Sequence, residues 1–186
     1  VTIDITEKYY NDCVRYLIYG NVLKNNTYPL SVSAERMFQS IAIAQYAKDV
    51  DAEYIVHGST GAGNDQIRFD VAFAVISPSS KIITPIRDEK LSRQQEVEYL
   101  QANGVNYSWE KAKYSINRGI WGTSVGGVET LTSNQALPED AYPTQLSRTE
   151  PSVIEIEFEK GIPVGLDGEK LSPVALIQKL NEIGGE

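Results

Sequence analysis

The sequence has little of what disulfide-rich or histidine-dependent proteins need. Its 186 residues include one cysteine, Cys13, and one histidine, His57. A single cysteine cannot form an internal disulfide, which favours a reducing compartment or a protein that is indifferent to the redox state of its compartment. The chemistry considered below needs no histidine-based catalytic triad, and only one histidine is present. Taken alone, His57 is better interpreted as a hydrogen-bonded structural residue than as a catalyst.

Long hydrophobic runs and an excess of positive charge are also absent. No apolar stretch approaches the roughly 18 residues of a membrane-spanning helix, and the first residues do not resemble a signal peptide. Lysine and arginine number 17 against 25 acidic residues, a net charge of −8, which opposes an extended nucleic-acid surface. With 41% apolar and 23% charged residues, the composition predicts a cytoplasmic globular protein of one large or two small domains, with no membrane or nucleic-acid partner.

The most informative segment runs from His57 to Phe69 and reads HGSTGAGNDQIRF. It combines the histidine with glycines at positions 58, 61 and 63 and with several polar side chains. The apolar residues 54–56 before it predict a short buried strand, and a helix is expected to begin from Asn64. Glycines at a strand-to-helix connection allow positive φ and let a ligand approach backbone N–H groups. The segment therefore predicts a ligand-binding loop.

The order of residues in this loop argues against two common nucleotide motifs. A P-loop continues with lysine and then serine or threonine, whereas Asn64 and Asp65 follow Gly63, and the glycine spacing differs from the dinucleotide fingerprint. Aspartate instead of lysine favours a ligand that carries a positive group, while Thr60, Asn64 and Arg68 suit carboxylate or carbonyl oxygens. An amino acid and a nucleotide are the ligands implied. The alternative is a glycine-rich surface turn whose Asn or Asp caps the helix.

Hydrophobic patterning predicts an α/β fold with a parallel sheet. The expected elements of the first half are a helix over 33–48, a strand over 53–57, a helix over 69–76 and a strand over 81–86. Strand, helix and strand in series place the loop at the carboxyl end of a strand, where such folds bind ligands.

A shift in composition after Arg87 towards charged, helix-prone residues predicts the domain boundary. The expected domains are 1–88 and 89–186. In the second domain, apolar and acidic residues alternate over 154–159, which predicts a strand paired in a hairpin with 162–166. Ser172 followed by Pro173 predicts the start of a final helix.

The loop resembles the H-G-x-T-G-K-G-N-D-Q-x-R-F segment of the argininosuccinate synthase family. Four further segments resemble motifs of the same family, Y-x-L-G-x-S-x-x-R at 28–36, I-x-A-P-W-R ending at 87, W-S-x-D-x-N-L-W-x-x-S at 114–124 and F-x-x-G-x-P-V at 158–164. The similarity thus extends essentially from end to end. The sequence departs from it at Ala62, where the family usually has a lysine beside the phosphates, and at Ser31, Ile86 and Gly126-Gly127.

The resemblance implies the C-terminal part of a PP-loop ATPase-like, Rossmann-like nucleotide-binding domain, followed by an α+β synthetase and oligomerisation domain. The implied enzyme is an ATP-dependent carbon–nitrogen ligase of arginine biosynthesis that joins citrulline and aspartate through a citrullyl-adenylate and releases AMP and pyrophosphate. ATP, as its Mg²⁺ complex, citrulline and aspartate would be the small-molecule partners. Members of the family associate as homotetramers, and no protein metal site is expected.

The site residues that the resemblance implies fall into three groups. Citrulline would contact Tyr28, Ser33, Asn64, Arg68, Ser115 and Ser124. Aspartate would contact Thr60, Asn64 and Asp65. ATP would lie against His57 and Gly58.

The family's pyrophosphate-binding S-G-G-L-D-T-S loop does not occur in these 186 residues. We therefore expect the chain to be a central piece that lacks this N-terminal loop and a C-terminal part, and that does not turn over alone. Two alternatives stay open, a different adenylating α/β ligase and a non-catalytic oligomerisation fragment.

Overall fold

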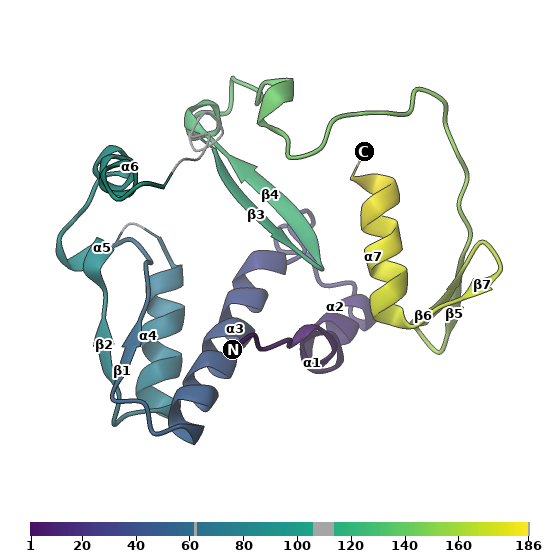
Figure 1. Ribbon diagram of the computed structural model, residues 1–186. Helices are drawn as coiled ribbons and strands as arrows, with labels where there is room; N and C mark the ends of the chain where they lie inside the picture. Colours follow the sequence, from purple (N-terminus) through teal and green to yellow (C-terminus); the bar gives the residue numbers. More distant parts are fainter. Residues whose placement is uncertain (62, 106–113, 186) are drawn as a thin grey trace. The chain divides into compact units, whose positions relative to one another are not determined.

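The structure is a computed structural model of the chain, and it describes residues 1–61, 63–105 and 114–185 (Figure 1). The contacts between residues divide the chain into two units. The first unit consists of Val1–Ile3 and Glu35–Lys111, and the second unit consists of Asp4–Ala34 and Ala112–Glu186. The boundary expected after residue 88 differs from this division. The charged segment that suggested it forms helix α6, Arg93–Ala102, which counts with the first unit.

A pair of parallel strands forms the sheet of the first unit. Strand β1, Tyr54–Val56, pairs with β2, Lys81–Ile83, in the register Ile55 to Ile82. Helices α3, Ser31–Asp49, and α4, Asp65–Ile76, supply the rest of the core. The buried residues of this core are Ala44, Ala47, Ile55, Ala72 and Phe73. The parallel α/β pattern expected from the sequence is thus confirmed.

Both strands of the first unit lead into polar segments at their carboxyl ends. Strand β1 continues into His57 and the glycines, and β2 continues into Thr84 and the short helix α5, Pro85–Asp88. The expected extension of β2 to residue 86 was wrong, because Pro85 occupies the first turn of α5, a position that suits its fixed φ and missing N–H. Since the strands are parallel, these two segments leave the sheet at the same edge.

The second unit begins with a nearly continuous helix. It consists of α1, Thr6–Tyr9, a π-helical turn, Tyr10–Val14, and α2, Arg15–Tyr19. Cys13 lies in the π-helical turn, and burial raises the pKa of its thiol. A thiol with a raised pKa carries little thiolate at neutral pH, so Cys13 is a poor nucleophile.

Two antiparallel sheets and a helix complete the second unit. Strands β3, Ser115–Gly119, and β4, Gly122–Gly126, form one hairpin. Strands β5, Ile156–Glu159, β6, Ile162–Leu166, and β7, Glu169–Lys170, form the other sheet, which contains the expected hairpin. Helix α7, Pro173–Gly184, packs against β6. In the chain segment that connects β4 to β5, two 3₁₀ turns occur, Val128–Leu131 and Glu139–Ala141.

Helix α7 begins with the cap that its sequence predicts. The Ser172 hydroxyl accepts a hydrogen bond from the backbone N–H of Ala175 at 3.3 Å, and Pro173 follows at the first helical position. We expect Ser172→Ala to lower the free energy of unfolding of the complete gene product by about 1 kcal/mol, because one N–H at the helix start loses its acceptor. Urea denaturation measures this loss. Ser172→Asp, which retains an acceptor, should keep wild-type stability, and equal losses in both variants would exclude the capping role.

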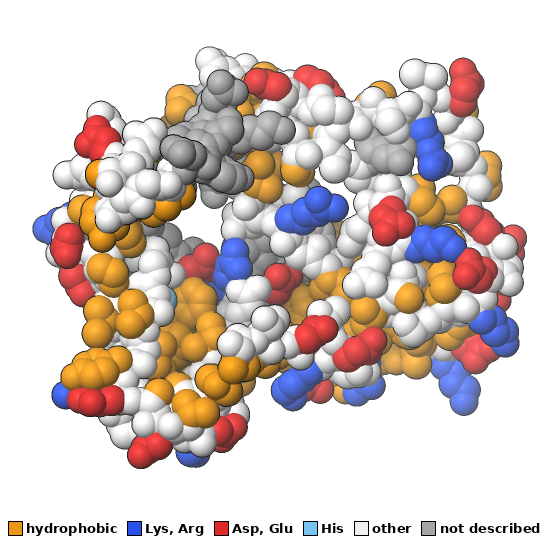
Figure 2. Space-filling view, viewed as in Figure 1, with side chains coloured by type: hydrophobic (Ala, Val, Ile, Leu, Met, Phe, Trp, Pro, Cys, Tyr) orange, Lys and Arg blue, Asp and Glu red, His pale blue; other side chains and the backbone are white. Residues whose placement is uncertain are grey.

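Several large apolar side chains of the first unit are exposed. Figure 2 shows hydrophobic atoms gathered over β1, β2 and α4, where Val56 is 62% exposed and Val75 is 75% exposed. In the described part of the chain, no helix has the combination of length and apolar composition needed to cross a bilayer. The apolar character of this unit therefore lies on a surface patch and in its core.

Candidate functional site

His57 is the first residue after β1, and two aromatic rings and one hydrogen bond fix its imidazole. The ring packs against Phe69 and Phe73 of α4, at centroid distances of 5.4 and 5.9 Å. Its Nδ1 accepts the backbone N–H of Ser59 at 3.3 Å, so that in the neutral imidazole the proton is on Nε2. With its side chain 9% exposed, His57 shapes the start of the loop, as its isolated position in the sequence suggested.

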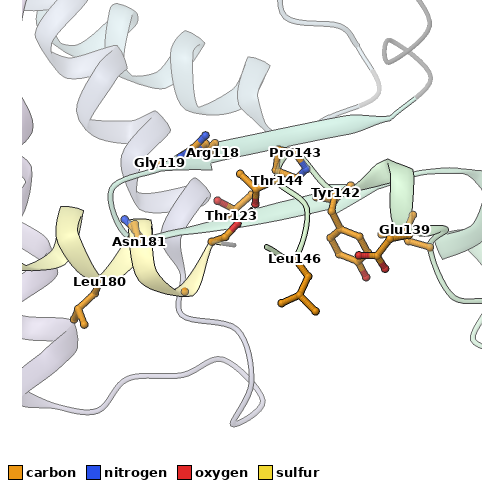
Figure 3. A pocket seen from close by; sticks show the side chains of 14 residues that line it. Arg118, Gly119, Thr123, Glu139, Tyr142, Pro143, Thr144, Leu146, Leu180 and Asn181 are labelled. Carbon is orange, nitrogen blue, oxygen red and sulfur yellow. Dashed lines mark hydrogen bonds between the residues drawn. The ribbon is translucent and has the colours of Figure 1, made fainter. Parts of the chain in front are cut away.

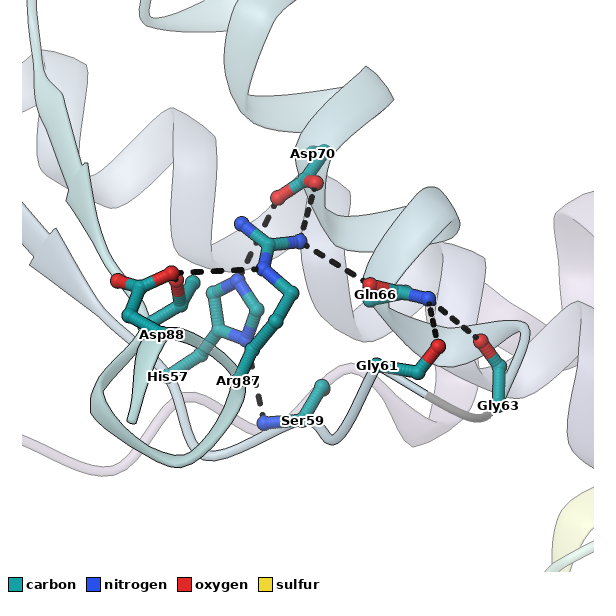
Figure 4. Close-up of polar contacts among 9 residues, drawn as sticks. His57, Ser59, Gly61, Gly63, Gln66, Asp70, Arg87 and Asp88 are labelled. Carbon is teal, nitrogen blue, oxygen red and sulfur yellow. Dashed lines mark hydrogen bonds and ion pairs between the residues drawn. The ribbon is translucent and has the colours of Figure 1, made fainter. Parts of the chain in front are cut away.

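Asp70 and Arg87 continue the network beyond the histidine. His57 Nε2 lies 3.5 Å from Asp70 Oδ1, within ion-pair distance, and neither atom has a hydrogen-bond partner among the described residues. Arg87 Nη1 donates to Asp70 Oδ2 at 2.6 Å, and its Nε lies 3.9 Å from Asp88 Oδ1 (Figure 4). Thr84, buried at the end of β2, donates its hydroxyl to the same Asp88 oxygen. The edge of the sheet is therefore linked from β1 to α5 by charged groups.

Gln66 connects this network to the glycines of the loop. Its Nε2 donates to the carbonyl oxygens of Gly61 and Gly63, at 2.7 and 3.2 Å. Its Oε1 accepts from Arg87 Nη1 at 3.3 Å. Figure 4 shows these groups in one continuous chain of contacts. One glutamine side chain thus holds the second half of the loop.

A cluster of opposite charges lies at the start of α4. Asp65 accepts from Arg68 Nη1 at 2.6 Å, and its other carboxylate oxygen lies 3.6 Å from Nε of Arg36 on α3. All three side chains are about one-quarter to one-third exposed. Two guanidinium groups and one carboxylate leave a net charge of +1, which suits a ligand with a carboxylate as well as an ammonium group.

The remaining predicted residues of the loop face solvent. Gly58, Thr60 and Asn64 are exposed, and Asn64 precedes α4 without forming a side-chain cap. The surface-turn alternative, in which that side chain caps the helix, therefore lacks its hydrogen bond. Ala62, the position of the missing lysine, lies outside the described residues. Among the described residues of the loop, Gly58, Thr60 and Asn64 are therefore accessible to a ligand.

Four residues predicted to contact citrulline belong to the second unit, and Asn64 and Arg68 belong to the first. Within the second unit, the Trp121 indole Nε1 donates to the Pro29 carbonyl at 3.1 Å. This bond ties the segment of Tyr28 and Ser33 to the turn of the hairpin that carries Ser115 and Ser124. Ser33 also donates its hydroxyl to the Leu30 carbonyl at 3.3 Å.

The β3–β4 register places the two predicted serines on one face of the hairpin. Asn117 pairs with Ser124 and Ser115 with Gly126, so the side chains of Ser115, Asn117 and Ser124 project from the same face. A cavity of about 840 Å³ lies on the opposite face, where Arg118 and Thr123 line it (Figure 3). This cavity is therefore not the pocket that the serines were predicted to form.

Sequence reasoning assigned no role to four residues of the first unit that the structure brings to the loop. These residues are Arg36, Gln66, Asp70 and Arg87. Arg36 and Arg87 are the last residues of two segments that resemble family motifs, and these motifs could have identified them as site residues. No motif or spacing in the sequence pointed to Asp70. Across the described ranges, no three histidine, cysteine, aspartate or glutamate side chains are grouped so that they could hold a metal ion.

Comparison with known proteins covers both units. A family model described as the arginosuccinate synthase N-terminal HUP domain matches residues 1–106, and one described as the arginosuccinate synthase C-terminal domain matches residues 114–186. Curated relatives called argininosuccinate synthase include those of Methanocaldococcus jannaschii, 39% identical over 188 residues, and Sulfurisphaera tokodaii, 38% identical over 185 residues. They align with 100% and 99% of this chain, respectively, and the chain covers 47% of each relative. The chain thus spans about half the length of the curated relatives it matches.

Proposed function

Because the chain belongs to the argininosuccinate synthase family, we propose that its gene product joins citrulline and aspartate in an ATP-dependent ligation. The ureido oxygen of citrulline attacks the α-phosphate of ATP, forms citrullyl-adenylate and releases pyrophosphate. The amine of aspartate then attacks the activated carbon and displaces AMP, which leaves argininosuccinate. ATP enters as its Mg²⁺ complex, in which the ion is part of the substrate.

The observation that supports this proposal best is the charged cluster beside the open loop. Arg36, Asp65 and Arg68 lie at the carboxyl-end edge of the parallel strands, where α/β folds bind their ligands. A zwitterionic amino acid offers a carboxylate for a guanidinium fork and an ammonium for the Asp65 carboxylate.

The proposed contacts follow the chemistry of each side chain. Aspartate is held by Thr60, Asn64 and Asp65, and ATP lies against Gly58 and the backbone of His57. Citrulline is held by Tyr28, Ser33, Asn64, Arg68, Ser115 and Ser124. Hydroxyl and amide groups of this set both donate and accept hydrogen bonds, as the α-amino, carboxylate and ureido groups of the substrates require.

Catalysis in this proposal depends on orientation. No side chain of the described loop is placed as a free general base, because the His57 nitrogens face Ser59 and Asp70. Holding the ureido oxygen in line with the α-phosphate, and then the amine next to the adenylate, turns two encounters into steps within one complex. We further propose that the gene product works in the cytoplasm as a homotetramer.

Pyrophosphate release from the complete gene product tests the proposal. We expect release to require ATP and citrulline together, and AMP with argininosuccinate to appear only when aspartate is also present. Mass spectrometry of the products distinguishes this ligase from another adenylating enzyme. Absence of both products from folded protein, or release that is indifferent to citrulline, would contradict the proposal.

A further inference from the structure

We infer that Arg87 is a positioning residue that sets the conformation of the described parts of the glycine-rich loop, residues 57–61 and 63–64. It acts through two branches, one through Asp70 to His57 and one through Gln66 to the glycine carbonyls. The inference deepens the proposed function and rests on it only for the kinetic effects. Arg87 itself touches no reacting group in this scheme.

The first branch orders the start of the loop. Arg87 donates to Asp70 Oδ2 at 2.6 Å, which leaves Asp70 Oδ1 directed at His57 Nε2, 3.5 Å away. A carboxylate facing Nε2 favours the proton on that nitrogen and leaves Nδ1 as an acceptor. His57 Nδ1 then receives the Ser59 N–H, which folds the chain directly after β1. Removing the arginine would leave Asp70 free to turn away from the imidazole.

The second branch orders the end of the loop. Gln66 can donate to the carbonyls of Gly61 and Gly63 only while its amide is turned with Oε1 towards Arg87. The carbonyl and N–H of a trans peptide point in opposite directions. Directing the Gly63 carbonyl towards Gln66 therefore turns the Asn64 N–H away from Gln66. A donor at this position is what a ligand carboxylate or phosphate needs.

Packing reinforces both branches. The loop lies directly against the start of α5, since a Cβ added at Gly61 would be 3.7 Å from Arg87 Cγ, and one at Gly58 would be 3.8 Å from Ile86. The Arg87 side chain is 28% exposed, so its bonds are partly shielded from water. One nitrogen, Arg87 Nη1, donates to both Asp70 Oδ2 and Gln66 Oε1, and it lies one atom further along the side chain than a lysine ammonium would. A lysine at this position would therefore keep the pair with Asp70 and lose the longer bond to Gln66.

Three variants of the complete gene product test this role, Gln66→Leu, Arg87→Lys and the double variant. We expect Gln66→Leu to speed hydrogen–deuterium exchange at the end of the loop, over residues 61–64, by about tenfold, with exchange at residues 57–59 and in the buried part of α4 unchanged. The KM values for ATP and aspartate should rise by about tenfold while kcat changes less than about threefold. Arg87→Lys should reproduce both effects, and the double variant should be no worse than either single one, since both break the same branch.

Lys81→Met provides the matched control. Lys81 lies on β2 and pairs with Glu53 at 3.4 Å, with both side chains more than half exposed. Its removal should change neither loop exchange nor KM. Two results would overturn the inference. One is exchange that is faster throughout the first unit in Arg87→Lys and not only in the loop. The other is a double variant whose changes in exchange and KM equal the sum of those of the single variants. If the wild-type protein proved to have no ligase activity, the proposed function would fail, but the exchange pattern would still decide the role of Arg87.

Discussion

Asp65→Asn is expected to lower kcat/KM for aspartate by about 100- to 1,000-fold, the equivalent of about 3 to 4 kcal/mol in transition-state binding. The asparagine keeps the shape of the side chain but removes the charge that would hold the ammonium group. It also leaves Arg36 and Arg68 without the carboxylate that they share. The lost charged hydrogen bond and the two unneutralised guanidinium groups both weaken aspartate binding and so lower kcat/KM. Steady-state rates with aspartate as the varied substrate measure the loss.

The KM for citrulline separates a direct role of Asp65 from an indirect one. If Asp65 served only to orient Arg68, the KM for citrulline would rise and the KM for aspartate would stay unchanged, which would contradict its assignment as an aspartate ligand. Asp49→Asn is the matched control, because Asp49 ends α3 and accepts an exposed hydrogen bond from Gln45. That variant should retain wild-type rates.

Local patterns were sufficient to predict the framework of the first unit. The apolar residues around Ile55, the glycines after His57 and the spacing of apolar residues in α4 each depend on neighbours in sequence. The position of the loop at the carboxyl end of β1 followed from the strand–helix–strand order, and the structure confirms it. The start of α7 was equally local, since a serine and a proline adjacent in sequence define it.

Contacts between distant segments were outside the reach of such patterns. Arg87 meets Asp70 and Gln66 from 17 and 21 residues away, and a charged residue carries no mark of which partner it will find. The same holds for the grouping of residues 4–34 with the C-terminal half, where the Trp121 bond to the Pro29 carbonyl joins positions 92 residues apart. The β2 end was mispredicted because an apolar residue after proline fits a strand and a first helical turn equally well.

The core of the first unit and the candidate site share one helix. Helix α4 turns Phe73 into the core, where its ring lies 5.7 Å from that of Phe69, and both rings support the imidazole of His57. The same helix presents Asp65, Gln66 and Asp70 to the loop side. Loss of core packing should therefore reach the loop through the histidine.

Phe73→Ala is expected to destabilise the complete gene product by about 3 to 5 kcal/mol. The ring is 1% exposed and packs among Ala44, Ala47 and Ile55, so its removal leaves a cavity in addition to the lost burial. Urea denaturation followed by far-ultraviolet circular dichroism measures the change. Val75→Ala, two residues further along the same helix at a position that is 75% exposed, should stay within about 0.5 kcal/mol of the wild type. Similar losses of stability in the two variants would mean that α4 packs against the core with a different face than the one described. The contact between Phe73 and His57 would then no longer support the arrangement of the loop.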